Sequence, residues 1–199
     1  MILKRTLTLL LLLACSTTLF AQDYKANVKQ SFSTYYKYLV AGEFEKSMDY
    51  LPPAIFAVVP RAQMVTALKS VMTNPEIQIR LTSFEIKEIL DKRKIDTANY
   101  VKIRYVGGIT MKMKGDSTET VQERENRLNA TKTALENSFG SGNVGLELKT
   151  ETFTVTTTKN SWGISKNGIT DWKFVLVDPS QRLILEKILP KEIIEESLN

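Results

Sequence analysis

The chain has 199 residues, of which 43% are hydrophobic and 25% are charged, with a formal net charge of +5 at pH 7. These values are typical of a soluble domain with its own core, and so mild a positive charge does not favour a nucleic-acid-binding protein. Histidine is absent, which removes the commonest general base and metal ligand, and the only cysteine, Cys15, cannot form an internal disulfide. We therefore expect no cofactor and no metal site.

The N-terminus has the pattern of an export signal. The basic pair Lys4-Arg5 precedes an apolar run, residues 7–14, that is too short to span a bilayer as a helix. Cleavage after Ala21 would remove residues 1–21 as a signal peptide and leave a single mature domain over residues 22–199. We expect that domain to be exported, either periplasmic or secreted.

A lipoprotein is the alternative. Residues 12–15, Leu-Leu-Ala-Cys, resemble a lipobox, in which Cys15 would be lipidated and would anchor the chain to a membrane. Apolar character continues beyond Cys15 in Leu19-Phe20, and this favours simple cleavage. Without lipidation of Cys15 we expect no membrane attachment.

Helices are predicted before any strand. Residues 24–41 carry apolar side chains at three- and four-residue spacing, and Gly42 is suited to end that helix in a left-handed conformation. Residues 43–51 predict a second, short helix that Pro52-Pro53 ends. Proline at a first helical position predicts a third helix over residues 60–72.

The central strand of the predicted sheet covers residues 99–114. Apolar side chains recur at odd-numbered positions and basic ones at even-numbered positions, as expected for a strand with one face on a core: Val101, Ile103, Tyr105, Ile109, Met111 and Met113 against Lys102, Arg104, Lys112 and Lys114. The pair Gly107-Gly108 predicts a bend in this strand. The preceding strand, residues 77–86, changes parity near Thr82-Ser83, which predicts a bulge.

The remainder of the chain predicts further elements on this sheet. Residues 116–137 have near-helical spacing and predict a surface helix, and the threonine-rich residues 144–159 predict a strand. Residues 160–167 are interpreted as a tight excursion. Trp172 leads an alternating last strand, and further helices follow after residue 179. The predicted fold class is α+β, a strongly curved antiparallel sheet wrapped around the N-terminal helices.

Residues 35–46, Tyr-Tyr-Lys-Tyr-Leu-Val-Ala-Gly-Glu-Phe-Glu-Lys, resemble the opening of the nuclear transport factor two-like superfamily, also called the cystatin-like cone. The strand Trp172-Lys173-Phe174 is similar to a late core strand of that superfamily. The resemblance implies a cone whose sheet wraps the first helix and leaves a cavity at its wide end. It implies that the helices at about 116–137 and after 179 are additions, and it implies little about chemistry.

The resemblance offers one candidate for catalysis. In relatives such as ketosteroid isomerases, a tyrosine of the first helix helps to bind a developing oxyanion, and carboxylates on the sheet transfer the proton. Tyr35 has a similar spacing from Gly42, but the inward positions of the predicted core strands carry no aspartate or glutamate. The alternative interpretation, which the residue types favour, makes Tyr35 an aromatic of the core.

The sequence therefore favours a non-catalytic exported domain that binds a small apolar ligand or a protein partner in the cell envelope. Two other readings stay open: an isomerase or dehydratase that uses Tyr35 in the cone cavity, and a structural homodimer through the open face of the sheet. No catalytic or metal-binding residue is assigned. The predicted pocket residues are Tyr35, Tyr105, Met111 and Trp172.

Overall fold

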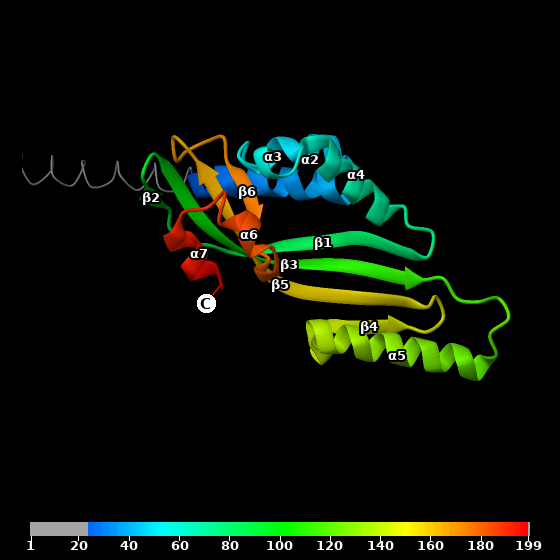
Figure 1. Ribbon diagram of the computed structural model, residues 1–199. Coiled ribbons are helices and arrows are strands. Elements are labelled where there is room, and N and C mark those ends of the chain that lie inside the picture. The colour runs from blue at the N-terminus through cyan, green and yellow to red at the C-terminus, as the bar shows by residue number, and fades with distance from the viewer. Residues whose placement is uncertain (1–23, 199) are drawn as a thin grey trace, which may run out of the picture.

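The computed structural model describes residues 24–198. The predicted signal peptide, its cleavage site and Cys15 lie outside the described residues. The described chain is α+β, with helices first and then an antiparallel sheet that does not close, which confirms the predicted fold class (Figure 1). Between residues 24 and 198, no helix is both long and apolar enough to cross a membrane.

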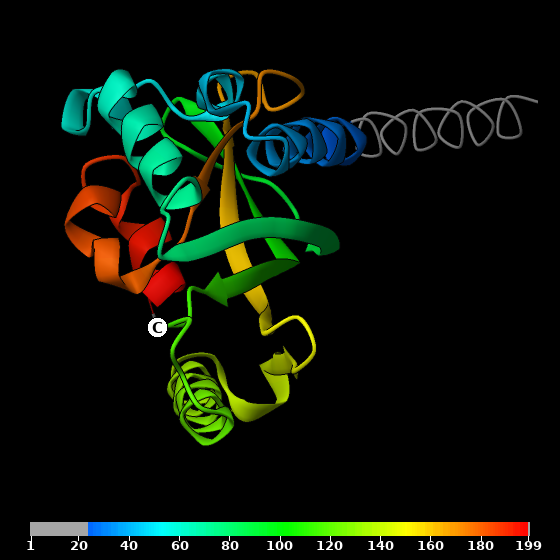
Figure 2. The same cartoon turned by 90° about the vertical axis from the view of Figure 1, so that its right-hand side faces the viewer.

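Three long strands and three short ones make up the sheet described over residues 24–198. The long strands β1 (Ile77–Ile89), β3 (Ala98–Met113) and β5 (Thr152–Ser165) lie side by side, and the short strand β4 (Val144–Glu147) extends the order to β1-β3-β5-β4. The other short strands lie at the opposite end: β2 (Arg93–Ile95) pairs with β3, and β6 (Lys173–Leu176) pairs with β5. The long strands twist strongly between the two ends (Figure 2).

The first helix is described over residues 24–40, and Gly42 ends it as predicted. Gly42 has a φ of +71°, its N–H donates to the Leu39 carbonyl at 3.2 Å, and the Glu43 N–H donates to the Tyr38 carbonyl at 2.9 Å. This pair of bonds is the Schellman motif, which satisfies carbonyls that the helix end leaves free. The chain then turns into α2 (Phe44–Ser47) and the 3-10 helix η1 (Met48–Tyr50).

The first helix packs on one face of the sheet and forms the main core. Val101, Ile103 and Tyr105 are buried on that face, as the alternation of β3 predicts. Phe32 of the helix lies over them, with ring centroids 5.1 Å from Tyr105 and 5.0 Å from Phe174. The helices α3 (Ile55–Val58) and α4 (Arg61–Met72) extend this layer toward β1 (Figure 1).

Two irregularities let β1 follow the curve of β3. The register of the β1–β3 pair shifts between Leu81 and Ser83, which confirms the predicted bulge, and again between Ile86 and Glu88. The first shift faces Gly108 of β3, where a Cβ would lie only 2.8 Å from the Thr82 hydroxyl oxygen. A glycine is needed there because the bulged strand approaches so closely.

The C-terminal segment covers the opposite face of the sheet at the β2 and β6 end. It consists of the 3-10 helix η3 (Pro179–Gln181), α6 (Arg182–Leu185) and α7 (Lys191–Leu198). A second core cluster lies beneath it and includes Tyr100, Trp162, Val175, Leu189 and Ile193.

The predicted excursion over residues 160–167 is wrong, because β5 continues through it as far as Ser165. Trp162 is buried within this strand, and its indole N–H donates to the Ser197 hydroxyl at 2.7 Å. A buried polar N–H needs such a partner, and it comes from α7, which is distant in the sequence. This part of β5 stays extended because it pairs with β3 on one side and with β6 on the other.

The helix expected at 116–137 is α5, Val121–Phe139. It begins later because Thr120 and Glu123 form a capping box: the Glu123 N–H donates to the Thr120 hydroxyl, and the Thr120 N–H donates to the Glu123 carboxylate at 2.9 Å. A short 3-10 turn, η2 (Ser141–Asn143), leads from α5 into β4. The helix packs beside β4 and β5, away from the first helix (Figure 1).

Candidate functional site

A cavity of about 790 Å³ lies between the sheet, α4 and the chain that follows β6. Figure 2 shows α4 and α6 next to each other on one side of the curved strands. The volume is in the range of pockets that hold small molecules, roughly 300–1,000 Å³. The cavity therefore has the size expected of a ligand site.

Apolar side chains from three parts of the chain line the cavity. The first helix and the sheet supply the inner wall, with Leu39, Ile109 and Phe174 among its residues. Met64, Leu68 and Met72 of α4 form a second wall, and Val177, Ile184 and Ile188 form a third. On the same helix Val65 is buried in the core, whereas Val71 is 50% exposed.

The C-terminal wall was missed in the sequence, although its signal is present. Ile184 and Ile188 are four residues apart, as are Leu185 and Leu189, so the segment has two apolar rows rather than one. Ile184, Leu185 and Ile188 line the cavity, while Leu185 and Leu189 are buried in the second core cluster, on which Ile188 also packs. The same segment therefore covers the second core cluster and closes one side of the cavity.

The charged residues of the lining are Lys159 and Asp178, and both are exposed. Asp178 caps η3: its carboxylate accepts from the Ser180 hydroxyl at 2.7 Å and from the Ser180 N–H at 3.0 Å. These bonds, helped by the nearby Lys159 cation, lower the pKa of the Asp178 carboxyl. Both charges thus lie where water reaches them, and the interior of the cavity is uncharged.

The predicted pocket residues divide between two places. Tyr35 and Tyr105 line the cavity. Trp172 and Met111 are not part of its lining: Trp172 is 1% exposed in the core beside Tyr24, at 6.4 Å between ring centroids, and Met111 is half-buried opposite Phe153 of β5.

The tyrosines of the cavity are neutral phenols at ordinary pH. Burial raises the pKa of the Tyr35 hydroxyl far above its usual value, and Tyr36 adds to the shift. Burial likewise raises the pKa of Tyr36 and of Tyr105. Among the described residues, no carboxylate accepts a hydrogen bond from Tyr35, so the proton-transfer partner of an isomerase is not found beside it.

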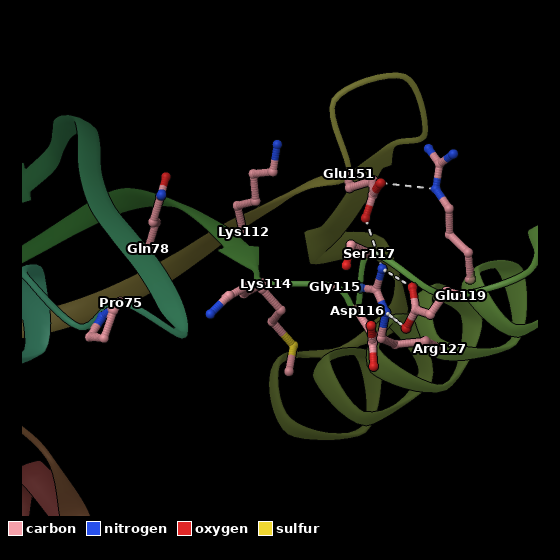
Figure 3. Close-up of a pocket in the computed structure, with 12 residues that line it drawn as sticks. Pro75, Gln78, Lys112, Lys114, Gly115, Asp116, Ser117, Glu119, Arg127 and Glu151 are labelled. Carbon is pink, nitrogen blue, oxygen red and sulfur yellow. Dashed lines mark hydrogen bonds and ion pairs between the residues drawn. The ribbon is translucent and has the colours of Figure 1, made fainter.

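A second, polar cleft of about 450 Å³ lies between the start of α5 and the ends of β1 and β3 (Figure 3). Arg127 donates to both Glu119 oxygens at 2.7 and 2.9 Å and to Glu151 at 2.9 Å, and Glu151 also pairs with Arg124 at 2.9 Å. This network raises the pKa of Arg127 and lowers that of Glu151. Because these charges already neutralise one another, we interpret the cleft as structural.

The outer face of the sheet near β4 is polar. Thr154, Thr156 and Thr158 of β5 are exposed there, together with Arg80 of β1 and Lys112 of β3. A homodimer through this face would therefore have to form on threonines and charges. Stable self-association usually uses a more apolar core.

Comparison with protein-family models, curated proteins and solved structures finds no match to this chain. Within residues 24–198, no group of three or more histidine, cysteine, aspartate or glutamate residues is placed to hold a metal ion.

Proposed function

We propose that this protein is a non-catalytic binding module that holds a small apolar ligand in the cavity beside the first helix. The observation that carries the proposal is a mostly apolar-lined space of about 790 Å³, whose charged lining residues, Lys159 and Asp178, are exposed. Removing apolar ligand surface from water contributes roughly 25 cal/mol per Å². The burial of its apolar surface could therefore supply the free energy that binds a small apolar ligand in this cavity.

The sequence and fold support two further parts of this proposal. The N-terminal pattern of residues 1–21 supports a location outside the cytoplasm, and at that location the ligand would come from the cell envelope or medium. The curved sheet around the first helix agrees with the cone that the nuclear transport factor two-like resemblance implies. Membership of that superfamily stays a proposal.

Titration with the neutral fluorescent probe N-phenyl-1-naphthylamine tests the binding site. Ala67 of α4 lines the cavity and is exposed, so Ala67→Phe should put a ring into the space without crowding the core. Ala62, on the same helix and exposed, does not line the cavity, and Ala62→Phe is the matched control. The two variants share the small loss of helix propensity.

We expect the probe to bind the wild-type protein, and Ala67→Phe to weaken it by about tenfold or more, equivalent to about 1.4 kcal/mol. Ala62→Phe should leave the affinity unchanged. Failure of the wild-type protein to bind the probe, or equal losses in the two variants, would contradict the proposal. Native mass spectrometry of the protein from its own source would then show whether it retains a ligand or a protein partner.

A further inference from the structure

Three tyrosines meet at the inner wall of the cavity. Tyr35 and Tyr36 are consecutive in the first helix and Tyr105 lies in β3, and each is at most 5% exposed. All three line the cavity. The rings of Tyr36 and Tyr105 lie edge to face with centroids 5.9 Å apart, and both Tyr36 and Tyr35 are close enough to raise the pKa of Tyr105.

Their hydroxyls have no protein partner within the part of the chain that the structure describes. Burial and the neighbouring tyrosines account for the raised pKa values of Tyr35, Tyr36 and Tyr105, with no contribution from a hydrogen bond. Tyr24 of the same helix differs, because its hydroxyl bonds the Asp91 carboxylate at 3.5 Å and accepts from the Lys92 N–H at 3.2 Å. More than about nine in ten buried polar groups are paired, so three unpaired neighbours need an explanation.

These hydroxyls are open to the cavity rather than sealed in the core. Among residues 24–198, no tyrosine hydroxyl is both fully shielded from solvent and without a hydrogen-bond partner. The Tyr36 oxygen lies against Gly107, 2.9 Å from the place where a Cβ would stand, and Gly107 also lines the cavity. The wall thus presents phenol donors to whatever occupies the space.

We propose that the ligand is an uncharged apolar molecule with a carbonyl oxygen, such as a ketone or ester, and that this oxygen accepts hydrogen bonds from the hydroxyls of Tyr36 and Tyr105, whose rings lie edge to face. The inference rests on the proposed function. A carbonyl oxygen has two lone pairs and can accept from two phenols at once. The rest of the ligand would lie against the apolar walls.

The charge distribution disfavours a carboxylate at the same place. An ionised carboxylate buried without a cation is costly, and neutral phenols supply none. Lys159 is the one cation of the described lining, and it is exposed. A fatty acid would therefore have to bind with its head at the Lys159 side, leaving the tyrosine hydroxyls unpaired.

Displacement of the naphthylamine probe by 2-undecanone, undecane and undecanoate at pH 8 tests the inference in the wild-type protein. We expect the ketone to displace the probe at a concentration about tenfold or more below that of the alkane, since each net hydrogen bond contributes about threefold to tenfold. Undecanoate should bind more weakly than the ketone. Because the phenols stay protonated, ketone affinity should not change between pH 6 and 9.

Tyrosine-to-phenylalanine variants, which remove one hydroxyl each, show which residues bind the carbonyl oxygen of the ketone. Tyr36→Phe and Tyr105→Phe should each reduce ketone affinity about threefold to tenfold and leave alkane affinity unchanged. Tyr38→Phe is the matched control, because Tyr38 lies on the same helix and packs on Tyr50 outside the cavity lining. Circular dichroism would verify that each variant keeps its fold.

The outcomes separate the two proposals. If no compound displaces the probe and the probe itself does not bind, the proposed function fails. If ketone and alkane bind equally, or the tyrosine variants behave like Tyr38→Phe, the carbonyl inference fails while binding in the cavity stands. Tightest binding by undecanoate, lost in Lys159→Gln, would likewise overturn the inference and place the polar head at the exposed rim.

Discussion

The replacement of Trp172 is the most direct test of the core. Trp172 immediately precedes β6 and is 1% exposed, with its ring centroid 6.4 Å from that of Tyr24. Its indole N–H donates to the Ile169 carbonyl at 2.9 Å and so fastens the turn before β6 to the core. Gly163 on β5 provides the space: a Cβ there would stand 3.4 Å from the Trp172 ring and 2.8 Å from Val101.

Trp172→Ala should lower the free energy of unfolding by about 3–5 kcal/mol, the usual cost of removing a large buried aromatic. About 1 kcal/mol of this is the lost hydrogen bond, since Ile169 is exposed and its carbonyl can bind water instead. Trp172→Phe keeps much of the ring volume and should cost less, about 1–2 kcal/mol. A domain of this kind has a total stability of about 5–15 kcal/mol, so both variants should remain folded at low temperature.

Urea unfolding followed by circular dichroism gives these values without relying on tryptophan emission. Leu183→Ala is the control, because Leu183 is 77% exposed and its truncation should change stability by less than about 0.5 kcal/mol. The chain has two tryptophans, so Trp162→Phe leaves Trp172 as the single reporter. Loss of less than 1 kcal/mol in Trp172→Ala, or free quenching of Trp172 by acrylamide, would refute the packing described above.

Three further predictions follow from single contacts. Gly42→Ala should lower the free energy of unfolding in urea by about 1 kcal/mol, because alanine is strained in the left-handed backbone at φ +71°. Nothing lies within 4 Å of the added Cβ, so no steric clash adds to this cost. An unchanged free energy of unfolding would mean that the first helix does not end in this left-handed conformation. Glu196 forms partly exposed ion pairs with Arg93 at 2.6 Å and with Lys102 at 3.3 Å. Glu196→Gln should therefore lower the free energy of unfolding by less than about 1 kcal/mol, and this loss should vanish at high salt. A loss of stability that does not depend on salt would contradict surface ion pairs. Burial raises the pKa of the Tyr105 hydroxyl in the folded state. Below the unfolded-state pKa of about 10 the free energy of unfolding is not affected by ionisation of this group, and above it the free energy of unfolding falls by about 1.4 kcal/mol per pH unit, because the unfolded chain loses the proton first. Unfolding at pH 9–11 should therefore show a shallower decline for Tyr105→Phe than for the wild type, and equal slopes would contradict the burial of its hydroxyl.

The sequence predicted correctly those helix and strand boundaries that are set by residues at or near the boundary itself. Gly42 ends the first helix, and the alternation of β3 correctly names its core face from Val101 to Tyr105, because backbone conformation and side-chain period are local properties. The parity change near Thr82 likewise revealed the bulge in β1. The failure over residues 160–167 has a nonlocal cause, since Trp162 is held extended by pairing with β3 and β6 and is covered by α7.

The candidate site was only partly predictable for the same reason. Tyr35 and Tyr105 were chosen because they lie on inward faces, and inward faces are readable from periodicity. Whether an inward residue meets packed side chains or open space depends on how far α4 and residues 177–188 stand from the sheet. No spacing in the sequence encodes that separation. Trp172 and Tyr35 therefore looked equivalent, although both belong to the first core cluster and only Tyr35 also lines the cavity.

The cavity walls come from opposite ends of the described chain, and this has a consequence for synthesis. A ribosome would release the first helix and α4 first, then the long strands, and residues 181–188 only after all of these. Until that last segment emerges, Leu68 and Met72 of α4 would face solvent across an unfinished hollow, and no ligand could be enclosed. The ability to bind would thus appear only when residues 181–188 fold onto the sheet, and a protease cut soon after β6 would abolish it while leaving the first core intact.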